Sequence, residues 1–365
     1  MSLMGHLPED RAGNGSPAEL QRLVIQLGTA MVAAGDAVDL IEGSLGRLVA
    51  AYGVAGVQIA LLPTSLFIQT GTGEGAHVQF SSQVAPPLRL DQIDRLYRLA
   101  RQLERAEFSV SAGLDQLAGV YQRQPAFGWP LRTLGHAVLT AGLVLLIQPT
   151  PSGLLGALVL GLFIGVLKLV QIQPVVLILP IMASFLTSAA VLGAADYLHI
   201  DNPIRLLVAP LVTFLPGGML AIATMEIAAG QMVSGASRLV NGFVQLALLA
   251  FGIVVAGVLV RASPADYIDH RVAGLGAWAG WAGVIVFALG VYLHFSAPLS
   301  SLPWILLVLY VAFAGQAIGD VLFGGQISGF FGAAAMTPLV LGVLTGTAAY
   351  GAADAGFRRL TRTPT

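Results

Sequence analysis

Residues 206–238 read LLVAPLVTFLPGGMLAIATMEIAAGQMVSGASR. This run is long enough and apolar enough to cross a bilayer, but Pro216-Gly217-Gly218 interrupts it, and one carboxylate, Glu226, follows the break. A helix that is broken at bilayer depth frees backbone groups, which must be satisfied by protein or by a water-filled path. Membrane transporters build substrate sites in this way. The stretch therefore favours a transport role over soluble chemistry.

The composition of the whole chain agrees with a membrane protein. Of its 365 residues, 56% are hydrophobic and 10% are charged, against roughly 25% charged in an ordinary soluble domain. The mean hydropathy is +0.80. Many of the charged residues precede Trp129, so the sequence divides into a polar N-terminal part and an apolar membrane part.

Charge and cysteine content exclude several functions. The net charge of -1 gives no bulk attraction to nucleic acid, and the absence of cysteine removes disulfides, thiolate metal sites and cysteine nucleophiles. No basic segment leads into an apolar run at the N-terminus. We therefore expect no cleavable signal peptide, and we expect the first domain to stay in the cytoplasm.

The polar part is predicted to be a disordered tail, 1–16, followed by a cytoplasmic α+β domain, 17–125. Apolar residues at helical spacing predict one long helix, or two short ones broken near Gly35, between residues 17 and 52. Three short apolar runs predict a small antiparallel sheet, and two further helices complete the domain. The expected strands are 57–63, 65–71 and 77–84, and the helices are 90–107 and 108–121.

Candidate chemistry in this domain is sparse. Asp36, Asp39 and Glu42 lie at near-helical spacing, and with His77 they are compatible with a metal or acid–base cluster. A solvated helix face with a loop histidine is the favoured interpretation. The glycines of 71–75 predict a hairpin turn, because no phosphate-binding lysine follows them. We predict no metal and no cofactor.

The apolar part predicts a membrane domain, 126–352, of about eight transmembrane helices, followed by a basic cytoplasmic tail, 353–365. Arginines and lysines gather on one side of the alternating spans, which places both termini in the cytoplasm. This predicts a multi-span α-helical membrane protein of the plasma or inner membrane. The expected spans are 131–148, 152–171, 174–195, 204–226, 238–260, 275–295, 302–320 and 327–350.

Ionisable residues near the spans are few. Glu226 ends the broken span and either faces a cavity or lies at the cytoplasmic interface. Lys168 either compensates an anion or extends to the membrane surface. Asp320 is either a second proton-binding group or a helix-terminal aspartate at the outer surface. Arg238 fits a positive-inside anchor.

These features resemble the threonine/serine exporter family. The resemblance rests on the helical stretch 23–53, on the strand pair VQIALLPTSLFIQT, 57–70, and on the proline-glycine break with its acidic residue and GxxR ending, 214–238. It covers the chain from about residue 20 to about 350. Two departures stand out: Gln231 replaces an expected acidic residue, and the chain ends at 358–365, where the resemblance implies further spans. Either the chain is truncated or it lacks that segment.

The resemblance implies a secondary exporter of small hydrophilic amino acids that works as a proton antiporter. Pro216, Gly217, Gly218 and Lys168 would then bind substrate, and Glu226 with Asp320 would couple protons to transport. The expected partners are the amino acid, protons and the bilayer, with no nucleic acid and with homo-oligomers left open. One alternative is a succinate-like dicarboxylate exporter. Another class is a membrane-anchored sensor or enzyme that uses the N-terminal domain.

Overall fold

The structure is a computed structural model that describes most of residues 16–332. The predicted tail, 1–16, lies outside the described residues except for Ser16, and so does the predicted C-terminal tail. The undescribed internal positions are 55–56, 63–64, 72–75, 83–85, 148–149, 171–172, 199, 201, 269–273, 325–328 and 330–331.

Two helices, rather than one, open the chain. α1 spans Pro17–Ala34, and Ser16 caps it through a reciprocal capping box with Glu19. The helix ends at Gly35, whose φ of 91° lies in the left-handed region that glycine adopts without strain. α2 then spans Val38–Ala51. The break near Gly35 thus separates two helices and leaves a short turn between them.

The predicted antiparallel sheet is confirmed. Its strands are β1 (Val57–Leu62), β2 (Ser65–Thr70) and β3 (His77–Ser81), paired in the order β1-β2-β3. One face is covered, as the buried side chain of Ile68 shows, while Phe80 on the other face is 54% exposed. The alternation is typical of a sheet with one face on a core.

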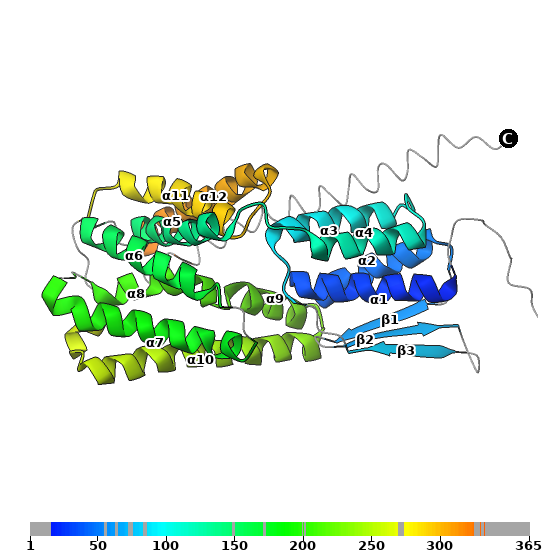
Figure 1. Cartoon of the computed structure of the whole chain (residues 1–365), viewed down its shortest axis with the longest axis horizontal. Helices are drawn as coiled ribbons and strands as arrows, with labels where there is room; N and C mark the ends of the chain where they lie inside the picture. Colours follow the sequence, from blue (N-terminus) through cyan, green and yellow to red (C-terminus); the bar gives the residue numbers. More distant parts are fainter. Residues whose placement is uncertain are drawn as a thin grey trace, which may run out of the picture.

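Two more helices complete this region, α3 (Leu90–Leu103) and α4 (Val110–Gln122). α1 and α2 pack against the strands on one side and against α3 and α4 on the other, which gives the layered arrangement in Figure 1. One apolar core joins the layers. Its fully buried large side chains include Leu23, Leu27, Ile41, Leu45, Leu48, Ile68, Leu96, Leu103 and Leu117.

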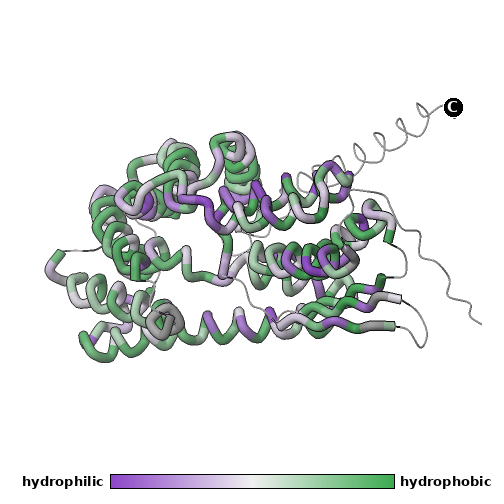
Figure 2. Tube along the Cα trace, turned by 45° about the vertical axis from the view of Figure 1, so that its right-hand side comes forward, coloured by the Kyte–Doolittle hydropathy of each residue, from purple (hydrophilic) through white to green (hydrophobic). Residues whose placement is uncertain are grey.

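The rest of the described chain is helical, and its helices lie alongside one another in Figure 1. Figure 2 shows that these helices are mostly hydrophobic, whereas polar residues are frequent in the N-terminal region. The elements are α5 (Trp129–Ile147), α6 (Pro151–Leu167), α7 (Gln173–Leu198), α8 (Pro203–Leu211), the 3-10 turn η2 (Val212–Phe214), α9 (Gly217–Ala228), α10 (Met232–Val260), η3 (Pro264–Tyr267), α11 (Trp278–His294), η4 (Leu299–Ser301) and α12 (Leu302–Phe323).

The described helices identify a multi-pass membrane protein. Four are long and apolar enough to cross a membrane, and the pair of 203–214 and 217–228, bent by 63°, makes a fifth candidate span. α6 and α11 are apolar but have only 17 residues each. Each of the first seven predicted spans falls on one of these helices or on the bent pair. The eighth, 327–350, lies almost wholly outside the described residues.

Glycine allows two of these helices to touch along their backbones. A Cβ atom added at Gly142 of α5 would lie 2.3 Å from the backbone nitrogen of Phe287 in α11. One added at Gly290 of α11 would lie 2.2 Å from the backbone nitrogen of Leu139. Small residues permit such close approach in membrane helices. The contact fixes α5 and α11 relative to each other, and both helices contribute to the site below.

Candidate functional site

The bent span opens where Pro216 precedes α9. Pro216 is the N-cap residue of that helix, and no side chain caps the first turn. Gly217 and Gly218 are exposed, and a Cβ added to either would meet no atom within 4 Å. The positive end of a helix dipole favours a negative group nearby. The break therefore combines an uncapped helix start with room for another molecule.

Four polar side chains meet just before the break. They come from different elements: His136 from α5, Lys168 from the end of α6, Thr213 from η2 and His294 from the end of α11. The Lys168 Nζ donates to Thr213 Oγ1 at 2.8 Å and lies 3.4 Å from Nε2 of His294. Nε2 of His136 lies 3.1 Å from Thr213 Oγ1. We call these four residues the bend cluster.

The hydrogen-bond partners indicate the protonation of the two histidines. Nδ1 of His136 lies 3.0 Å from the Gly161 carbonyl, and Nδ1 of His294 lies 3.0 Å from the Arg132 carbonyl. Carbonyl oxygens only accept, so each Nδ1 carries a proton. Each Nε2 is then free to accept, from the Thr213 hydroxyl and from the Lys168 ammonium respectively. This assignment satisfies every contact with two neutral imidazoles.

Lys168 supplies positive charge that no carboxylate compensates within the described part of the chain. Its Nζ also lies 5.0 Å from the centre of the Phe214 ring, within the range of a cation–π contact. Arg132 is close by, since its Nε is 3.5 Å from the His294 carbonyl. A cation removed from water is costly without a counter-charge. The bend cluster is therefore suited to binding an anionic group such as a carboxylate.

Glu226 lies away from the bend cluster, at the far end of α9. With a rise of about 1.5 Å per residue, it is roughly 15 Å along the helix from Pro216. Its side chain is fully buried, and its Oε2 is 3.2 Å from Nε of Arg238 at the start of α10. The two atoms lie within ion-pair distance, although they do not form an aligned hydrogen bond. The predicted surface anchor Arg238 is thus the partner of Glu226.

Both members of this ion pair contact the turn between α1 and α2. Oε1 of Glu226 accepts a hydrogen bond from the backbone N–H of Val38 at 3.1 Å. Nη2 of Arg238 donates to the backbone carbonyl of Asp36 at 2.8 Å. The N-cap residue of α2, Ala37, provides no side-chain cap. Glu226 therefore takes the place of a capping residue, and the bent span is joined to the N-terminal region.

The acidic residues of the α1–α2 region have structural partners. The Asp36 carboxylate accepts a hydrogen bond from the Tyr97 hydroxyl of α3, and burial raises the pKa of Asp36, opposed by that bond and by Arg238. Glu42 accepts from the Leu61 N–H at 3.0 Å, while Asp39 is exposed. Among the described residues, no group of three His, Cys, Asp or Glu side chains could hold a metal ion.

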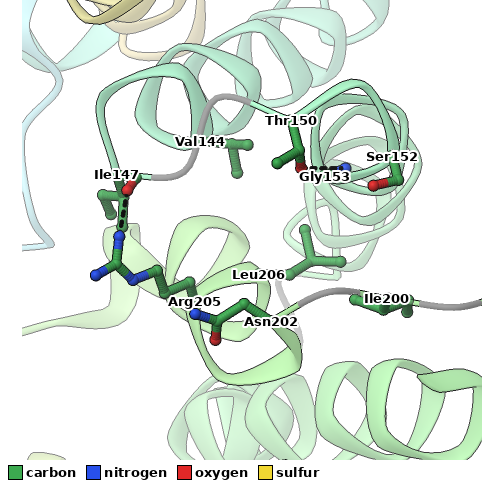
Figure 3. A pocket seen from close by; sticks show the side chains of 9 residues that line it. All are labelled: Val144, Ile147, Thr150, Ser152, Gly153, Ile200, Asn202, Arg205 and Leu206. Atoms are coloured by element: carbon green, nitrogen blue, oxygen red, sulfur yellow. Dashed lines mark hydrogen bonds between the residues drawn. The ribbon is translucent and has the colours of Figure 1, made fainter. Parts of the chain in front are cut away.

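Two other features lie outside the bend cluster. Asp320 is in the last turn of α12 with an exposed side chain. A small recess lies between the starts of α6 and α8 (Figure 3), where Arg205 donates to the Ile147 carbonyl at 2.6 Å and Thr150 Oγ1 accepts from the Gly153 N–H at 3.1 Å. These polar groups serve the local backbone. The recess is lined by Val144, Ile147, Thr150, Ser152, Gly153, Ile200, Asn202, Arg205 and Leu206.

Three members of the bend cluster were not among the residues predicted from sequence. His136 had a usable signal, because an ionisable residue inside a predicted span is a candidate functional residue by default. His294 lies at the end of another predicted span, and Thr213 directly precedes the break. Lys168, Thr213 and the two histidines become neighbours only when α5, α6, η2 and α11 pack together.

A multi-pass helical protein with a bent span and a polar cluster at the bend belongs, by fold and site, to the class of membrane transporters. Residues 22–260 match the ThrE family ("Putative threonine/serine exporter"), and the chain belongs to this family. It is a transporter family and not an enzyme family. Neither curated proteins nor solved structures gave a significant match. The matched residues run from α1 to the end of α10 and include the break, Lys168 and Glu226.

Proposed function

We propose that this protein exports threonine, serine or a similar small amino acid by proton antiport across the cell's inner membrane. Family membership supports the amino-acid substrate. A binding site at the bend is supported above all by the Lys168 ammonium, which has no carboxylate partner among the described residues and lies beside the open start of α9. A free amino acid brings a carboxylate that fits this ammonium and this helix end.

In this proposal Lys168 and the first N–H groups of α9 bind the substrate carboxylate. Gly217 and Gly218 allow the close approach, because a side chain would occupy the open space beside them. Backbone carbonyls released at the Pro216 break accept from the substrate ammonium. The neutral imidazole of His294 accepts a hydrogen bond from Lys168 Nζ and thereby orients the ammonium.

Proton coupling is assigned to Glu226, with Asp320 as a second candidate. Glu226 is the buried carboxylate of the bent span, and its charge is balanced by Arg238. Taking up a proton would remove that ion pair and alter the position of α9. Asp320 is exposed near the end of α12, so Glu226 is the stronger assignment.

We propose that the N-terminal domain lies on the cytoplasmic side of the membrane. It contacts the bent span at Glu226 and Arg238. Lys168 ends α6, and Arg132 lies in the first turn of α5. An excess of arginine and lysine at one membrane face is the usual mark of the cytoplasmic side.

The test is efflux of labelled threonine and serine from proteoliposomes with an imposed pH gradient. Lys168→Met should reduce efflux by at least tenfold, while Lys168→Arg should retain part of it because the charge remains. Gly218→Ala is the companion variant: no atom obstructs the new methyl group, so the protein should fold, and slower efflux would then reflect blocked substrate. Native rates for Lys168→Met would refute the assignment of the bend cluster.

A dicarboxylate such as succinate is the second candidate. Arg132 and Lys168 both contact His294, so two cations are available for two carboxylates. Competition among serine, threonine and succinate in the same assay decides between the substrates. Inhibition by succinate that is lost in Arg132→Gln, with serine efflux unaffected, would favour the dicarboxylate.

A further inference from the structure

We propose that the contact between Glu226 and the start of α2 is a proton-sensitive latch: charged Glu226 holds the N-terminal domain on the bent span, and protonated Glu226 releases it. This inference rests on the proposed function, because it explains how a proton on Glu226 would act on the bend. It also assigns a role to the N-terminal domain, which the family match leaves open.

The latch is a continuous series of contacts among four helices and the turn between α1 and α2. Tyr97 of α3 donates to the Asp36 carboxylate, and the Asp36 carbonyl accepts from Arg238 of α10. Arg238 pairs with Glu226 of α9, and Glu226 accepts from the Val38 N–H at the start of α2. Two of these contacts, from Arg238 to the Asp36 carbonyl and from the Val38 N–H to Glu226, join the N-terminal domain to the helix pair that follows the break. The latch residues are Asp36, Val38, Tyr97, Glu226 and Arg238.

The helix pair α9–α10 is closely packed at the latch. A Cβ added at Gly235 of α10 would lie 2.8 Å from the Ala223 carbonyl and 2.9 Å from the Ile227 N–H nitrogen, both in α9. Gly230 turns the chain between the helices with a φ of 87°. Two helices in such close contact move together more readily than they slide. A force on Glu226 or Arg238 is therefore transmitted along α9 to the break at Pro216.

The charge of Glu226 is what makes the latch strong. The carboxylate is fully buried, while Arg238 is 14% exposed. The ion pair with Arg238 and the hydrogen bond from Val38 are therefore shielded from bulk water, and both interactions are stronger for that reason. Protonation removes the attraction to Arg238 and weakens the cap on α2. Titratable groups on the elements that meet at the latch include Arg238 on α10, Asp36 in the turn before α2, Asp39 at the start of α2 and Tyr97 on α3.

Asp36 is a second carboxyl group at the latch that could produce the same response to pH as Glu226. A substitution at Asp36 distinguishes the two carboxyl groups. Arg238 bonds to the backbone carbonyl of Asp36 and not to its carboxylate. Asp36→Asn therefore removes a titrating carboxyl while it keeps the Arg238 contact. Glu226→Gln removes the charge at the proposed switch and keeps an oxygen that can accept from Val38. Only the second variant should abolish the response to pH.

The experiment uses the full chain in lipid nanodiscs without substrate. The sequence contains no cysteine, so Leu40→Cys and Ala236→Cys introduce the only two spin-label sites; both positions are exposed, on α2 and α10. Pulsed electron paramagnetic resonance then reports the distance across the latch. We expect a narrow distribution near neutral pH that becomes longer and broader as the pH is lowered.

Three comparisons decide the outcome. Glu226→Gln should give the broad distribution at every pH, and Asp36→Asn should behave like the unsubstituted pair. Hydrogen exchange of the peptide containing Val38 should rise by about fivefold on release, the effect of losing a typical helix cap. A narrow, pH-independent distribution in Glu226→Gln would overturn the latch. A working latch in a protein without amino-acid efflux would instead overturn the proposed function.

Discussion

Removing Arg238 should destabilise the protein more than neutralising its partner Glu226. Glu226 is 0% exposed and Arg238 is 14% exposed. Arg238→Met leaves a buried carboxylate without a counter-charge, and breaking a buried pair in this way costs about 3–5 kcal/mol. Glu226→Gln leaves an arginine that still bonds to the Asp36 carbonyl and can reach water. That variant should cost about 1–2 kcal/mol.

The double variant gives the sharper result. Glu226→Gln with Arg238→Met leaves no buried charge at the latch, so it should be more stable than Arg238→Met alone. The coupling free energy between the two positions should be about 1–3 kcal/mol. Lowering the pH should also restore part of the stability of Arg238→Met, because the stranded Glu226 carboxylate can be neutralised by a proton.

The assay is reversible unfolding in mixed detergent micelles, followed by tryptophan fluorescence. The four tryptophans lie in α5, α11 and α12, so the signal reports the membrane helices, while circular dichroism reports the whole chain. If Arg238→Met is no less stable than Glu226→Gln, or if the two effects simply add, then Glu226 and Arg238 do not form a buried ion pair.

Three further predictions concern backbone contacts and the N-terminal region. Gly142→Ala should lower the free energy of unfolding by about 3 kcal/mol or more, because its Cβ would lie 2.3 Å from the α11 backbone. Gly218→Ala, with no atom within 4 Å of the new Cβ, should leave the stability unchanged. Equal losses in the two variants would contradict the close contact between α5 and α11. Tyr97→Phe should cost about 1–3 kcal/mol in the same assay by leaving the Asp36 carboxylate without its donor. Burial raises the pKa of Asp36 above 3.8, so the unfolded chain loses this proton at a lower pH than the folded protein does. The native protein should therefore lose stability relative to Asp36→Asn as the pH rises above about 4. A stability difference that does not change with pH would exclude this burial effect.

The local structure of the N-terminal region was readable from its sequence. Apolar spacing predicts helix between residues 17 and 52 and allows a break near Gly35, because helical periodicity and the left-handed backbone of glycine are local properties. The structure has both features. The three strands also follow from short apolar runs, since each forms with its chain neighbour. Interactions between residues that are close in sequence can be recognised from a single sequence.

In the membrane part, the helices and the break at Pro216 could be predicted from the sequence. Length and apolarity predict spans because the bilayer imposes a fixed thickness, and the break at Pro216 follows from proline and glycine chemistry. The size of the bend, 63°, and the lengths of α6 and α11, 17 residues each, came from the structure. Helix ends depend on neighbours as well as on composition.

Length, apolarity and local residue chemistry therefore predict a membrane transporter with a broken span, an N-terminal α+β region and a short set of charged candidate residues. Which of these candidates meet depends on how the helices pack. Lys168 joins His136 and His294, which are 32 residues before it and 126 after it in the chain, whereas Glu226 joins Arg238 and the start of α2. The physical reason is that side-chain partners across helices depend on crossing geometry and glycine contacts, which local hydropathy does not encode.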